Sequence, residues 1–165
     1  MRCLLIAGGA LVLAACTSET PANQVAAAPA SIPAGEYEVT TTVAQFRSTD
    51  NTTPIVRVEQ GTTATSRACI GADGAPPPGM FTAQGDVCTP QNAYARNGRL
   101  SASYACTREG APGQIMVEAN GRFADDGLSG EVRTSTFLTG SGDYELRQDF
   151  TGGRVGECPA GGAAS

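Results

Sequence analysis

Apolar and polar residues alternate along most of the chain beyond residue 34. In segment 36–43, for example, Tyr37, Val39, Thr41 and Val43 fall on one face of an extended chain. A period of two is typical of β-strands that turn one face to a core and the other to solvent. The pattern predicts strands over 36–43, 62–70, 114–123, 128–138, 144–150 and 154–158, and a hairpin within 88–106.

Short turn signals separate these segments. They are Arg96-Asn97-Gly98, Asp125-Asp126-Gly127 and Gly140-Ser141-Gly142, and each places glycine where a positive φ is wanted. Consecutive hairpins predict one all-β domain over residues 35–159, an antiparallel up-and-down meander of about seven to eight strands that forms an open barrel or a compact sandwich. Segment 71–81, GADGAPPPGMF, predicts a proline-stiffened loop with a short helical turn after Gly79.

The amino terminus has the features of an export signal. Arg2 precedes an apolar run over 3–13, which is too short for a membrane-spanning helix of ~20 residues. The run ends in Leu13-Ala14-Ala15-Cys16, which resembles the lipobox of bacterial lipoproteins. We therefore expect a signal peptide over residues 1–15 and lipidation of Cys16.

The lipobox implies a location and a linker. Segment 16–34 is rich in Ala, Pro, Ser and Thr, which predicts a flexible tether. The lipid on Cys16 would attach this tether, and so the domain, to the membrane. At the other end of the chain, segment 160–165 predicts a disordered tail. We expect a lipid-anchored, periplasm-facing protein of a Gram-negative cell envelope. Thr17, where inner-membrane retention favours Asp, indicates the outer rather than the inner membrane.

Four cysteines remain after the signal peptide and the lipid site, and an even number in an exported domain predicts disulfides. A three-residue turn over 96–98 sets Cys88 opposite Cys106, whereas a two-residue turn sets Cys88 opposite Thr107. The first register favours a Cys88–Cys106 bridge and leaves Cys69 to pair with Cys158. Likewise, a three-residue loop over 140–142 sets Val132 opposite Phe150 and Arg133 opposite Asp149.

Composition narrows the chemistry. The chain has no His, Lys or Trp, its 11 basic residues are all Arg, and its formal net charge is -5. The missing imidazole excludes Ser-His-Asp catalysis and imidazole-bound metals, and an acidic chain without a basic cluster is a poor nucleic-acid ligand. Asp125-Asp126 with Glu131 does not have the spacing of an EF-hand calcium loop, so we interpret it as a solvated turn. The period of two places the remaining candidate acids on the wet face, namely Glu118, Glu131, Glu145 and Asp149. We expect no enzyme, cofactor or metal site.

The predicted inner face is unusually polar. It carries Thr41, Asn92, Thr134, Thr136 and Gln148, together with Gly121 and Gly130. Such residues either line a cavity for a small ligand or serve as hydrogen-bonding groups within a filled core. A filled core favours a structural or protein-interaction domain with an envelope protein as partner, which is the preferred interpretation. The alternative is a periplasmic module that binds a small molecule or lipid.

Several motifs resemble one family. The domain opens with Gly35-Glu36-Tyr37-Glu38-Val39-Thr40-Thr41, continues with Arg67-Ala68-Cys69 and Gly85-Asp86-Val87-Cys88, and closes with Gly153-Arg154-Val155-Gly156-Glu157-Cys158. These are similar to the proteobacterial lipoprotein family known as domain of unknown function 3617. The resemblance covers about residues 35–159 and implies fold and location rather than an activity. Tyr37 stands where members more often have Trp, and the loop after Cys69 departs from their more helical stretch.

Overall fold

The computed structural model describes residues 29–125 and 127–159. The predicted signal peptide, the predicted lipidation site Cys16, most of the predicted tether and the predicted tail lie outside these residues. The described part contains seven strands and one 3-10 helix. They are β1 (Gly35–Ser48), β2 (Thr63–Ile70), η1 (Pro78–Met80), β3 (Asp86–Arg96), β4 (Arg99–Arg108), β5 (Ala111–Ala124), β6 (Gly127–Leu138) and β7 (Tyr144–Gly156).

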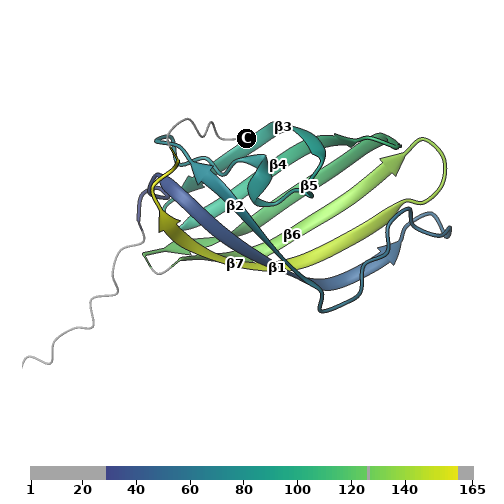
Figure 1. Cartoon of the computed structure of the whole chain (residues 1–165), viewed down its shortest axis with the longest axis horizontal. Helices are drawn as coiled ribbons and strands as arrows, with labels where there is room; N and C mark the ends of the chain where they lie inside the picture. The colour runs from purple at the N-terminus through teal and green to yellow at the C-terminus, as the bar shows by residue number, and fades with distance from the viewer. Residues whose placement is uncertain (1–28, 126, 160–165) are drawn as a thin grey trace, which may run out of the picture.

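The strands form one antiparallel sheet in the order β2-β1-β7-β6-β5-β4-β3. The sheet curves into a half-barrel that stays open between β2 and β3 (Figure 1). This confirms the all-β meander, and the predicted strand 154–158 is the end of β7 rather than a separate element. The connection from β2 to β3, which contains η1, passes over the concave side and supplies part of its filling (Figure 1).

The core lies on the concave side because the alternating apolar residues of every long strand point there. Phe150 of β7 packs on Phe81 of the β2–β3 connection, with ring centroids 4.9 Å apart. Tyr104 of β4 is fully buried, and its hydroxyl donates a 2.7 Å hydrogen bond to the carbonyl of Pro76. These contacts attach the connection to the sheet and fill part of the concave side.

The packed domain starts before the predicted boundary at residue 35. Ile32 is only 3% exposed and belongs to the core. The carbonyl of Ala30 accepts a 3.1 Å hydrogen bond from the amide of Asn97, in the turn between β3 and β4. The hydroxyl of Tyr37 donates to Pro33. We call this end of the sheet, where β1 starts and β7 ends, the tether end, and the opposite end the far end; the tether end lies on the left in Figure 1.

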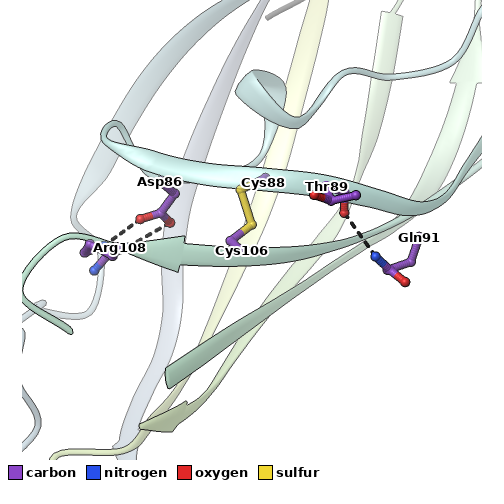
Figure 2. Close-up of a disulfide and its surroundings, with 6 residues drawn as sticks. All are labelled: Asp86, Cys88, Thr89, Gln91, Cys106 and Arg108. Atoms are coloured by element: carbon purple, nitrogen blue, oxygen red, sulfur yellow. Dashed lines mark hydrogen bonds and ion pairs between the residues drawn. A yellow bond between two sulfur atoms is a disulfide. The ribbon is translucent and has the colours of Figure 1, made fainter. Parts of the chain in front are cut away.

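The β3–β4 hairpin differs from its predicted register near the turn. Asn97 and Gly98 both have positive φ, 51° and 74°, and form a two-residue turn in place of the predicted three-residue loop. A β-bulge between Pro90 and Asn92 then inserts one extra residue. Cys88 therefore still lies opposite Cys106, as predicted, but because the bulge compensates for the shorter turn. The extra residue, Gln91, is visible beside this pairing in Figure 2.

The β6–β7 register is shifted by two residues from the prediction. Val132 lies opposite Gln148 and Arg133 lies opposite Arg147, because the connecting loop spans 139–143 and is longer than expected. A shift of two preserves which face each side chain occupies. The inner and outer faces are therefore as predicted, but the partners across the strands are wrong.

A carboxylate stabilises this longer loop at the far end. Asp50 accepts hydrogen bonds from the amides of Gly142, at 2.8 Å, and Asp143, at 3.0 Å. It also accepts hydrogen bonds from the hydroxyl and amide of Thr52. The Thr52 bonds, followed by the loop amides, hold the pKa of Asp50 well below its ordinary value. An ionised Asp50 thus ties the loop after β1 to the loop before β7.

Candidate functional site

The concave side of the half-barrel contains a groove of about 960 Å³ that the β2–β3 connection leaves unfilled. Its floor comes from β1, β5, β6 and β7, and its walls come from segments 56–67 and 78–86. The apolar residues in its lining include Val43, Val56, Val58, Met80, Phe81, Val117 and Leu146. A space of this size matches the clefts in which proteins hold small molecules, which occupy roughly 300–1,000 Å³.

Three of the predicted inner-face polar residues line this groove. Gln148 Nε2 donates a 3.2 Å hydrogen bond to Thr41 Oγ1 across β7 and β1. Thr134 of β6 is mostly buried and adds a third polar side chain to the floor. The floor of the groove therefore combines apolar side chains with an amide and two hydroxyl groups. Its walls add further uncharged polar residues, namely Thr62, Thr63, Thr65, Ser66, Thr82 and Gln84.

The other two predicted polar residues have different roles. The hydroxyl of Thr136 accepts a 2.8 Å hydrogen bond from the amide of Tyr144 and donates to its carbonyl, so it serves as a core hydroxyl. Asn92 was expected on the inner face, and this prediction is wrong. Asn92 is exposed because it follows the bulge that changes the strand register.

The two predicted inner-face glycines make room for an aromatic ring. Gly121 and Gly130 lie directly opposite each other on β5 and β6. A Cβ atom at either position would come within 2.8 Å of the ring of Phe150. Only glycine allows Phe150 to approach the sheet this closely, so these residues shape the core and do not line the groove.

A buried ion pair stands at the far end of the groove. Arg108 donates to Asp86 through Nε, at 2.6 Å, and through Nη2, at 2.9 Å. The Asp86 side chain is 1% exposed, and its hydrogen bond raises the pKa of Arg108. Figure 2 shows the pair two residues along each strand from the Cys88–Cys106 disulfide. The register predicted for the cysteines already implied this pairing, which the sequence analysis missed.

The cysteines form one bond and one close pair. Cys88 and Cys106 are joined by a disulfide between β3 and β4. Cys69 and Cys158 are free thiols in the structure. A hydrogen bond between these two thiols, together with burial, raises the pKa of Cys69 to about 11. The predicted Cys69–Cys158 disulfide is not formed here, although its partners are adjacent, and it stays a prediction.

Of the four acids assigned to the wet face, Glu118, Glu131 and Asp149 are exposed. Glu145 lies on the same outer face but is buried among three arginines, Arg47, Arg133 and Arg147, at 3.2, 2.9 and 3.2 Å. Burial opposes its ionisation, but the hydrogen bonds from Arg133 and Arg47 outweigh burial and lower its pKa. Glu145 is thus held as a carboxylate that joins β1, β6 and β7.

Residues 29–125 and 127–159 contain neither a cluster of metal ligands nor a membrane-spanning helix. No three Cys, Asp or Glu side chains there gather closely enough to hold a metal ion. No helix in these ranges has the length and apolar character needed to cross a membrane.

The structure does assemble a basic cluster that was not expected from the sequence. Arg96 lies opposite Arg99, and Arg99 lies opposite Arg122, so three exposed arginines form a row across β3, β4 and β5. We call them the arginine row. Residues 96 and 122 are distant in sequence, so only the strand register brings them together.

The sequence profile of the family described as protein of unknown function, DUF3617, matches residues 32–158. The chain belongs to this family. The DUF3617 match begins at the buried Ile32 and ends at Cys158, so it covers the whole sheet, the groove and all four domain cysteines. No curated protein and no solved structure matches the chain.

Proposed function

We propose that this DUF3617 domain is the periplasmic part of a lipid-anchored envelope protein and that its groove binds an uncharged ligand with an apolar body. The observation that carries the binding proposal is the unfilled space of about 960 Å³ on the concave side. A curved sheet with an open, largely apolar inner face is a common way to hold a small ligand.

The polarity of the groove supports an uncharged ligand. Its charged lining residues are Arg67, Asp86 and Arg108. Arg67 forms an ion pair with Glu38 at 2.7 Å, and Asp86 and Arg108 neutralise each other. A charged ligand would lose its hydration without finding an unpaired opposite charge, which is costly. Apolar surface on the ligand would be favoured, with Gln148 and Thr134 available to a hydroxyl or carbonyl group.

The alternative of a purely structural domain has less support. That interpretation predicts a filled inner side and an exposed apolar patch for a partner. The inner side keeps an unfilled groove. The exposed large apolar residues are spread over three strands, β3, β6 and β7, and the loop that follows β1, namely Val87, Tyr94, Phe137, Val155 and Ile55. The geometry therefore favours the ligand-binding module over the structural one.

Native mass spectrometry tests the binding proposal. The mature chain carrying Cys16→Ser would be exported behind a cleavable secretory signal and purified without detergent. We expect a discrete extra mass that disappears on denaturation. In the Gln148→Trp variant, the indole ring fills the groove floor and competes with the ligand for the same space. The fraction of protein that carries the extra mass should therefore fall by at least about 10-fold.

Asp149→Trp is the matched control, because it places the same ring one residue away on the exposed outer face. It should retain the extra mass. Circular dichroism would establish that both variants fold. A wild-type domain that is always bare, or equal loss in the two tryptophan variants, would contradict binding in the groove.

Lipid anchoring has its own test. The full chain expressed in a Gram-negative host should fractionate with membranes and carry a diacylglycerol adduct on Cys16 in its intact mass. Cys16→Ser should abolish the adduct, whereas Cys3→Ser, in the predicted signal peptide, should leave it unchanged. A wild-type chain recovered without the adduct, or an adduct that survives Cys16→Ser, would refute the anchoring proposal.

A further inference from the structure

The arginine row, Arg96, Arg99 and Arg122, is placed on the outer face of the sheet at the tether end. Each of the three residues is exposed, and the alternating neighbours Ala95 and Leu100 are buried on the concave side. Arg96 pairs with Arg99 across β3 and β4, and Arg99 pairs with Arg122 across β4 and β5. Like charges in directly opposite positions destabilise a sheet.

No carboxylate of residues 29–125 and 127–159 lies within ion-pair distance of the row. Six other arginines do form ion pairs, namely Arg47, Arg67, Arg108, Arg133, Arg147 and Arg154. The chain has 16 acids for 11 basic residues, so carboxylates are abundant. Within the described part of the chain, these three adjacent cations have no carboxylate partner, so their charge is available for an external anion.

The surface beside the row has room for such an anion. A shallow cavity of about 600 Å³ is lined by Arg99, Arg122 and the polar residues Ser129 and Thr151 on the next two strands. Guanidinium groups pair well with phosphate oxygens, and hydroxyl groups donate further hydrogen bonds. On β3, Tyr94 is 40% exposed on the same face, two residues before Arg96. Tyrosine is enriched where proteins meet the head-group region of a bilayer.

The row also lies where the predicted membrane tether reaches the domain. The amides of Asn97 and Gly98, in the turn between Arg96 and Arg99, donate to the carbonyls of Ala30 and Pro29 at 3.1 and 3.2 Å. From Cys16 to Pro29 there are 13 steps along the chain, which span at most about 45 Å when fully extended and roughly 20 Å as a flexible coil. A lipid on Cys16 would thus keep the row close to the bilayer surface.

We propose that the arginine row docks on the head groups of anionic phospholipids and holds the tether end of the domain against the membrane. The inference rests on the proposed lipid anchor for its geometry, and the row supplies a second, electrostatic membrane signal. A single lipid chain with a basic patch is a known combination for stable membrane attachment. The docking orients the domain with its tether end at the bilayer.

Vesicle binding by the chain without its lipid tests the row directly. The mature chain carrying Cys16→Ser would be sedimented with vesicles of phosphatidylcholine alone and with vesicles that also contain phosphatidylglycerol. We expect binding only to the anionic vesicles, weakening as salt is raised. Replacing the row by Arg96→Gln, Arg99→Gln and Arg122→Gln should weaken this binding by about 100-fold, since each charge contributes about 5-fold.

A second triple variant, Arg47→Gln, Arg57→Gln and Arg67→Gln, removes the same charge from exposed positions on β1, β2 and the loop between them and should retain most of the binding. Equal losses in the two triple variants would overturn the proposal, as would no binding, equal binding to both kinds of vesicle, or tighter row-dependent binding to duplex DNA than to the anionic vesicles. Because the tested chain has no lipid, failure here is distinguishable from failure of lipidation at Cys16. Circular dichroism of each variant excludes loss of folding as the cause.

Discussion

Replacing Phe150 with alanine is expected to lower the free energy of unfolding by about 3–5 kcal/mol. Phe150 is 1% exposed and packs on Phe81, which belongs to the connection that crosses the concave side. Its ring also covers the facing Gly121 and Gly130, which have no side chains to fill the space that alanine would leave. The result would be a cavity against a sheet that is too regular to collapse around it.

Urea denaturation measures this effect. The midpoint for Phe150→Ala should fall with little change in the slope, which indicates an unchanged cooperative unit. Phe137→Ala is the matched control, because Phe137 is 61% exposed on the outer face of β6. We expect that control to lie within about 0.5 kcal/mol of wild type. A loss below 1 kcal/mol for Phe150→Ala would contradict this account of the core.

Removing the Cys88–Cys106 bridge with Cys88→Ala and Cys106→Ala should cost about 3 kcal/mol of unfolding free energy. The bridge joins residues 18 positions apart and restricts the unfolded chain to a closed loop. It also lies beside the ion pair of Asp86 and Arg108, so its loss loosens the strand ends that hold that pair. Urea denaturation with and without reductant measures the difference.

The double variant Cys69→Ala and Cys158→Ala is the comparison. The two thiols are adjacent, so we expect the exported wild-type chain to contain both bridges and to have a mass about four hydrogens below that of the reduced chain. A deficit of two hydrogens would contradict the second bridge. If the double variant Cys88→Ala and Cys106→Ala is as stable as the wild type before reductant is added, the first prediction is contradicted.

The face of the sheet to which each side chain points was predictable from the sequence, because it depends only on whether the residue has an odd or an even position along its strand. The β6–β7 register was wrong by two residues, yet Thr134 and Gln148 still fall on the concave face. The face of Asn92 was not predictable in the same way. Its position depends on a single-residue bulge at Gln91. Pro90 signals an edge or an irregularity in the strand, but it does not fix whether a residue is inserted there.

The sites that sequence reasoning missed all depend on contacts between distant segments. Glu145 is buried because the register brings Arg47, Arg133 and Arg147 around it. The groove exists because the β2–β3 connection leaves part of the concave side unfilled. The path of this connection follows from contacts such as that between Tyr104 and Pro76. The alternation of residues along the strands predicted an unusually polar inner face, but it did not indicate where space would remain.

The open sheet leaves β2 and β3 as free edges, and such edges are natural templates for unwanted pairing between copies. Pro90 has no amide hydrogen, and the adjacent bulge at Gln91 breaks the regular line of donors and acceptors along β3. A second copy would therefore find no continuous ladder to extend on that side. The same irregularity that sets the cysteine register thus protects a half-closed domain from edge-to-edge aggregation where many copies are crowded together.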